Sequence, residues 1–103
     1  MPEVYQQFIT YAGGSVSTAG AKVAGGAKVT AGRTGAGVYT LTTADPIVVA
    51  SGIIMLVALN TAAGQINAVI TSSTVITVST FAADGTTATD KAFSYLLLIP
   101  EPS

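Results

Sequence analysis

The segment Gly35-Ala36-Gly37-Val38-Tyr39-Thr40-Leu41-Thr42-Thr43 decides the fold of this chain. Two glycines lead into a run of β-branched and aromatic residues, which favour strands. Successive side chains of a strand point to opposite faces. Tyr39 and Leu41 therefore share one face of the strand, and Val38 and Thr40 share the other. The segment therefore predicts the first well-specified strand of the core.

Similar runs follow toward the C-terminus, with turn signals between them. Ile53–Asn60 is apolar on both faces, which predicts a central strand that is covered on both sides. Gln65–Thr71 and Thr74–Phe81 both alternate, and their short Ser72-Ser73 junction predicts a hairpin. Ala92–Ile99 predicts the closing strand.

The N-terminal third is richer in glycine. Val4–Tyr11 predicts a strand or arm that ends at Gly13-Gly14, because paired glycines interrupt regular structure. A short repeat follows, with Ala-Lys-Val at positions 21–23 and again at 27–29. We expect the repeat to form a hairpin that turns at Gly25-Gly26 and holds its lysines in solvent, where they discourage edge pairing.

Short strands separated by turns every 8–12 residues are typical of all-β folds. We expect an antiparallel β-sandwich or small barrel, jelly-roll-like, with about seven to nine short strands and no substantial helix. Residues 1–14 are interpreted as an N-terminal strand or arm, 15–99 as a single β domain, and 100–103 as a C-terminal tail.

Charge is the most informative part of the composition. Only 9% of the 103 residues are charged and the net charge is −1, whereas soluble domains average about 25% charged residues. So sparse a charge predicts a chain that is packed against copies of itself or against a larger assembly. Four dispersed basic residues do not make a nucleic-acid surface.

No membrane partner is expected either. The apolar run Ile47–Leu59 is shorter than the roughly 20 residues of a spanning helix, and Ser51-Gly52 interrupts it. The first residues lack the basic and apolar regions of a secretory signal, so we expect synthesis in the cytoplasm without export.

No catalytic site, metal site or cofactor is predicted. The chain has no histidine and no cysteine, which removes the commonest general base and the commonest metal ligands. Asp84 and Asp90 are interpreted as soluble loop residues, with calcium binding as the alternative. Asp45 is interpreted as a turn residue, because nothing brings it to Glu101 as a carboxylate pair.

Apolar and aromatic side chains near the N-terminus and in the apolar strand are the candidate contacts with other subunits. Aromatic residues are frequent anchors of interfaces. The candidates are Tyr5, Phe8, Tyr11, Ile53, Ile54 and Leu56.

Three segments, Arg33–Thr42, Thr74–Thr80 and Asp90–Leu98, resemble the strands of small β-rich virion proteins of tailed bacteriophages. These include capsid decoration (cement) proteins and modules of head or tail fibres. The resemblance implies a non-enzymatic structural protein at the capsid surface of the virion, a homo-oligomer, most simply a trimer, that binds the major capsid protein. The alternative is a fibre or spike module whose loop 82–90 binds a surface glycan.

Overall fold

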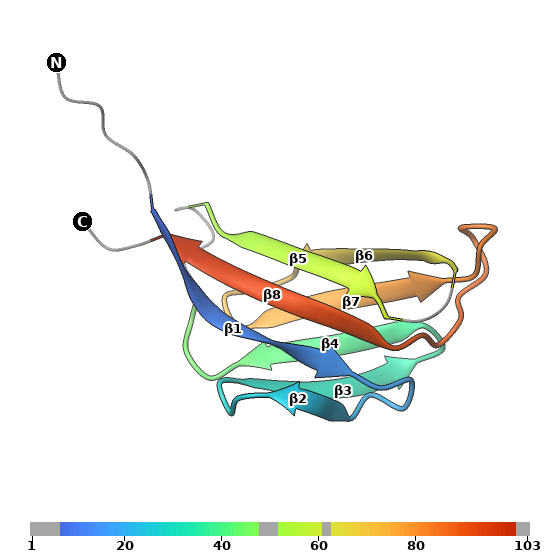
Figure 1. Cartoon of the computed structure of the whole chain (residues 1–103), viewed down its shortest axis with the longest axis horizontal. Helices are drawn as coiled ribbons and strands as arrows, with labels where there is room; N and C mark the ends of the chain where they lie inside the picture. Colours follow the sequence, from blue (N-terminus) through green and yellow to red (C-terminus); the bar gives the residue numbers. More distant parts are fainter. Residues whose placement is uncertain (1–6, 48–51, 61–62, 101–103) are drawn as a thin grey trace, which may run out of the picture.

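The computed structural model describes residues 7–47, 52–60 and 63–100. These residues form two antiparallel four-stranded sheets, which stack as a sandwich (Figure 1). Sheet A has the order β2-β1-β8-β5 and sheet B the order β3-β4-β7-β6. The predicted all-β fold is confirmed, and the described residues contain no helix. The strands are β1 (Phe8–Val16), β2 (Lys22–Gly25), β3 (Val29–Gly35), β4 (Val38–Thr43), β5 (Ile54–Leu59), β6 (Gln65–Ile70), β7 (Val75–Phe81) and β8 (Phe93–Pro100).

The core lies between the sheets and is centred on β4, as its alternation predicts. Tyr39 and Leu41 are completely buried, whereas Thr42 on the opposite face is exposed. The rings of Tyr39 in sheet B and Phe93 in sheet A meet edge to face, with centroids 5.2 Å apart. The buried core comprises Val16, Val29, Tyr39, Leu41, Ile47, Ile76, Val78, Phe93, Tyr95 and Leu97.

The prediction that Gly13-Gly14 ends the first strand is wrong. β1 continues through both glycines and pairs with β8 on one side and β2 on the other. A Cβ on Gly14 would collide with the carbonyl oxygen of Ala24 and would lie 3.0 Å from Tyr95 Oη. Glycine here permits a close approach of two strands rather than a turn.

The predicted hairpin of the Ala-Lys-Val repeat is also wrong. β2 belongs to sheet A and pairs with β1, whereas β3 belongs to sheet B and pairs with β4. The two copies of the repeat are therefore consecutive strands that cross between the sheets. Lys22 Nζ donates hydrogen bonds to the carbonyl oxygens of Gly26 and Val29, and so ties the crossover together.

Toward the C-terminus the predicted strands exist, with one change of position. β6 and β7 form the predicted hairpin. β5 falls within the predicted strand Ile53–Asn60, but it lies at the edge of sheet A instead of its centre. β8 lies inside the sheet, between β1 and β5. Pro100, assigned to the tail by the sequence, is the last residue of β8.

Candidate interaction surface

The outer face of sheet A carries a strip of aliphatic side chains on β5 and β8. The register places Leu56 opposite Leu96 and Ile54 opposite Leu98. Alternation directs the intervening residues of β8, Tyr95 and Leu97, into the core, where they are buried. The side chains of the strip therefore point away from sheet B, and Leu56 is 52% exposed.

β1 extends this strip across the sheet. Thr10 lies opposite Leu98 and Phe8 lies opposite Pro100, so both continue the outer face. Phe8 is 37% exposed. A shallow hollow runs along the face between the other two strands, lined by Leu56, Val57, Ala58, Ser94, Tyr95 and Leu96. We call Phe8, Ile54, Leu56, Leu96 and Leu98 the apolar strip.

The outer face of sheet B is chemically different, because most of its side chains carry a hydroxyl or an amide. The register of its four strands brings these residues side by side. They are Thr30, Thr40, Thr42, Asn67, Thr77 and Ser79, and the valines Val38, Val69 and Val75 lie between them. The two outer faces of the sandwich thus suit different neighbours, water for sheet B and an apolar partner for the strip.

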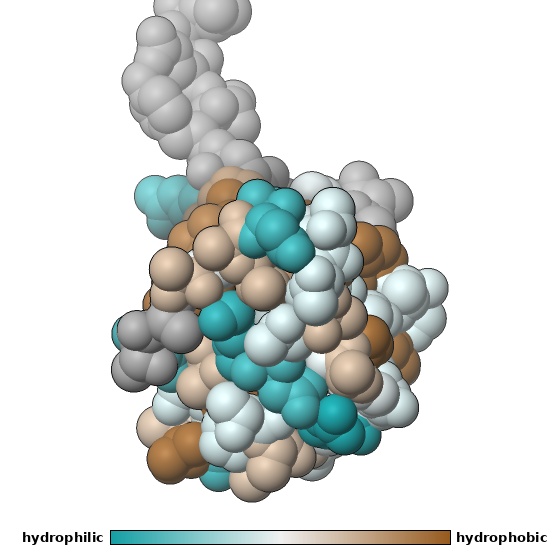
Figure 2. All heavy atoms as spheres, turned by 90° about the vertical axis from the view of Figure 1, so that its right-hand side faces the viewer, coloured by the Kyte–Doolittle hydropathy of each residue, from teal (hydrophilic) through white to brown (hydrophobic). Residues whose placement is uncertain are grey.

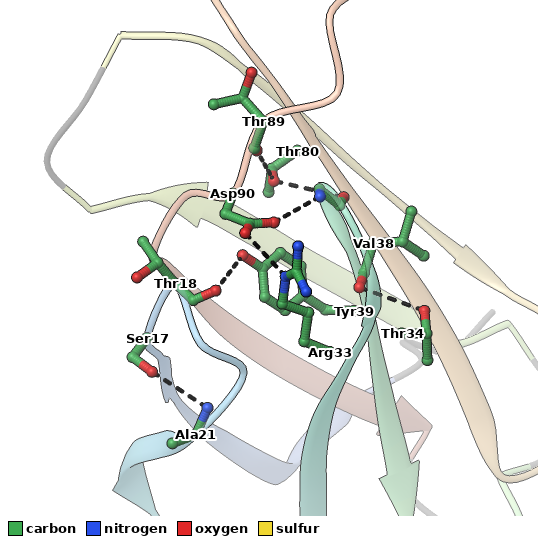
Figure 3. Close-up of polar contacts among 11 residues, drawn as sticks. Ser17, Thr18, Ala21, Arg33, Thr34, Val38, Tyr39, Thr80, Thr89 and Asp90 are labelled. Carbon is green, nitrogen blue, oxygen red and sulfur yellow. Dashed lines mark hydrogen bonds and ion pairs between the residues drawn. The ribbon is translucent and has the colours of Figure 1, made fainter.

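Polar contacts hold the end of the sandwich where β3 turns into β4 (Figure 3). Arg33 Nε donates to Asp90 Oδ2 at 2.9 Å, and the backbone N–H of Gly37 donates to Asp90 Oδ1 at 2.7 Å. These two donors hold the pKa of the Asp90 carboxyl below its usual value. The hydroxyl of buried Tyr39 donates to the carbonyl oxygen of Thr18 at 2.9 Å, and its burial raises its pKa.

Hydrophilic residues form a diagonal band across this end of the molecule (Figure 2). A hollow there is lined by Thr18, Ala19, Arg33 and Asp90. The charged side chains in this hollow are already paired with each other. The arrangement fastens loops to the β3–β4 turn and offers no unpaired charge for chemistry.

The carboxylate of Asp84 accepts hydrogen bonds from groups within the loop 82–90. Its Oδ1 accepts the backbone N–H groups of Thr86 and Thr87, both at 2.9 Å, and its Oδ2 accepts the Thr87 hydroxyl. These bonds lower the pKa of Asp84 to about 2. In the described ranges no three His, Cys, Asp or Glu side chains gather as metal ligands.

The structure separates the predicted contact residues into two groups. Phe8, Ile54 and Leu56 lie on the apolar strip. Ile53 packs against the core, and Tyr11 is half-buried, with its hydroxyl donating to Asp45 Oδ2 at 3.1 Å. Tyr5 lies outside the described residues, as does Glu101.

Sequence reasoning missed Leu96 and Leu98 as members of the strip. The available signal was that the closing strand is apolar on both faces. Leu96 and Leu98 lie on one face, and Phe93, Tyr95 and Leu97 lie on the other. The same pattern was recognised in the strand that became β5.

Comparisons with known proteins found no match: no protein-family model, no curated protein and no solved structure resembles this chain significantly. Within the described ranges, no helix is long and apolar enough to cross a membrane.

Proposed function

We propose that this chain is a non-enzymatic structural protein of a tailed-phage virion, a decoration protein that binds the assembled shell. The apolar strip on the outer face of sheet A is the observation that carries this proposal. The strip is the surface that contacts the major capsid protein, and the hydroxyl-rich face of sheet B is directed to solvent. The phage setting itself rests on the likeness of three strand segments to small virion proteins.

The mechanism is linkage by mass action. A protein that binds the assembled shell and not its free subunits stabilises the shell by a free energy that rises with the logarithm of its concentration over its Kd. No step of bond chemistry is needed. Rigid β-strands hold the strip flat and fixed before contact, so little conformational freedom is lost on binding.

The test is co-sedimentation with empty shells assembled from the major capsid protein of the phage that encodes this chain. Wild type should bind at a fixed number of copies per capsid subunit and should raise the temperature at which the shells come apart. Absence of binding at micromolar protein would contradict the proposal.

Two matched variants locate the binding face. Leu98→Ser removes an aliphatic side chain from the apolar strip, and Val75→Ser does the same on the outer face of sheet B. Both positions are half-buried and lie on strands inside their sheets. Burying a fully exposed leucine contributes about 1.5–3 kcal/mol. Because Leu98 is already half-buried, contact with the shell adds about half of that, and Leu98→Ser should weaken binding about three- to twelvefold. Val75→Ser should bind as wild type does.

A further inference from the structure

β5 is a free sheet edge with none of the usual protection against pairing. It is hydrogen-bonded only to β8, and its other edge pairs with no strand in the described part of the chain. Its six residues, Ile54–Leu59, contain no charge and no proline. Its register with β8 runs without a bulge. Such an edge presents a row of unpaired N–H and C=O groups to any approaching strand.

The other edges of the sandwich differ from β5. β2 is only four residues long and carries Lys22. β3 carries Arg33 and has a bulge at Arg33/Gly35. β6 is uncharged, but Gln65 and Asn67 stand beside Val69 on its outer face. Short strands, charges and bulges are the devices that prevent edge pairing, and β5 alone has none together with an apolar outer face.

From these features we infer that the β5 edge pairs with β5 of a second copy, antiparallel, to form one continuous eight-stranded sheet. This inference rests on the proposed function as a virion protein and specifies the geometry of the homo-oligomer that the resemblance implies. A second copy suits this edge because β5 and the neighbouring β6 (Figure 1) contain no charged residue, so two copies meet without repulsion. An extended strand gains affinity from main-chain hydrogen bonds, which any sequence can supply.

The pleat restricts the register of this pairing. Residues directly opposite each other in an antiparallel pair point to the same face. A two-fold axis perpendicular to the sheet must therefore lie midway between a residue of β5 and the same residue of the second copy. Centring on Leu56, which is 52% exposed, places this side chain against its own copy and Ile54 against Ala58 of the second copy.

The pairing also has a consequence for the shell. It places the apolar strips of two copies on one face of one sheet, so both contact the shell together. An interface with a two-fold axis joins copies in pairs. The inference thus predicts an even copy number in place of the trimer expected from the resemblance.

Single-cysteine variants test this geometry directly, because the wild-type chain contains no cysteine. Leu56→Cys should give a disulfide-linked dimer under mild oxidation, since opposite residues lie within the 4.4–6.8 Å Cα separation that a disulfide spans. Val23→Cys on β2 and Val69→Cys on β6 are matched controls, being 71% and 54% exposed in wild type. Both should stay monomeric on a denaturing gel.

Leu96→Cys distinguishes edge pairing from stacking of two outer faces. In the edge-paired dimer the two Leu96 positions are three strand spacings apart, about 14 Å, which is too far for a disulfide. Rapid linkage through Leu96→Cys with none through Leu56→Cys would overturn the inference in favour of face-to-face stacking.

Light scattering of the wild type distinguishes a failure of the edge-pairing inference from a failure of the proposed function. An oligomer whose Leu56→Cys variant does not cross-link refutes edge pairing and leaves self-association intact. A monomer at every concentration up to millimolar refutes edge pairing too, while shell binding is still measured independently by co-sedimentation. Even-numbered oligomers with selective cross-linking at position 56 are the expected result.

Discussion

Replacement of Gly37 by alanine should strongly destabilise the sandwich, although it adds a single methyl group. Gly37 has φ +68°, a left-handed conformation that costs residues with a Cβ about 1–2 kcal/mol. The added Cβ would lie 2.5 Å from the carbonyl oxygen of Thr80 and 2.9 Å from the backbone nitrogen of Thr89. Both contacts are with backbone, which cannot rotate away.

Relief of this clash would disturb the hydrogen bonds that Gly37 makes. Its carbonyl oxygen accepts the N–H of Thr80 at 2.8 Å, and its own N–H donates to Asp90. Each hydrogen bond contributes about 1 kcal/mol net. We therefore expect Gly37→Ala to lower the free energy of unfolding by about 3 kcal/mol, a large share of the stability of a small domain.

The assay is urea unfolding followed by tyrosine fluorescence and far-UV circular dichroism. Gly35→Ala is the matched control, because Gly35 lies two residues earlier at the end of β3, has no positive φ, and has no atom within 4 Å of an added Cβ. The control should differ from wild type by less than about 1 kcal/mol. Equal stabilities for the two variants would refute the close approach of the β3–β4 turn to Thr80.

Three further predictions concern polar groups. Tyr39→Phe removes the bond to the Thr18 carbonyl and should cost about 1 kcal/mol in urea unfolding, with an unchanged midpoint contradicting a structural role for that hydroxyl. Thr80→Val preserves shape in a fully buried site but removes the donor to the Thr89 carbonyl, so we expect a loss of about 1–2 kcal/mol by thermal unfolding. The depressed pKa of Asp84 means that its stabilising effect is present above about pH 4, the unfolded value, and is lost as the pH falls through about 2. Asp84→Asn should thus be less stable than wild type at pH 7 and should lose less stability between pH 4 and 2; parallel declines in urea midpoint would argue against this.

The local alternation of apolar and polar residues was sufficient to predict a strand wherever one face of that strand meets the core. The alternation of Val38–Thr43 predicted the strand and divided its side chains into two faces, and the structure buries the face of Tyr39 and Leu41. The same reasoning identified the β6–β7 hairpin and the strand that closes the fold. In segments of this kind, the sequence alone shows that one face of the strand is buried and the other is not.

Glycine and doubly apolar segments were less informative. Gly14 looks the same in sequence whether it ends a strand or lets two strands meet, and only the position of Ala24 decides between them. Ile53–Asn60 was placed at the centre of a sheet because both its faces are apolar, yet β5 is an edge. Strand order depends on pairings between distant segments, which no local window contains.

The first and last described strands are direct neighbours, with Phe8 opposite Pro100 and Val16 opposite Phe93. In chain order, the strands of sheet B are complete at Phe81, whereas sheet A lacks β8, which joins β1 to β5, until Pro100. We expect a chain that lacks β8 to be a half-built sandwich, because β5 then has no partner strand and the inner face of sheet B is partly uncovered. Because the two strands run antiparallel, a force applied at Phe8 and Pro100 would peel their hydrogen bonds one after another instead of shearing all of them at once.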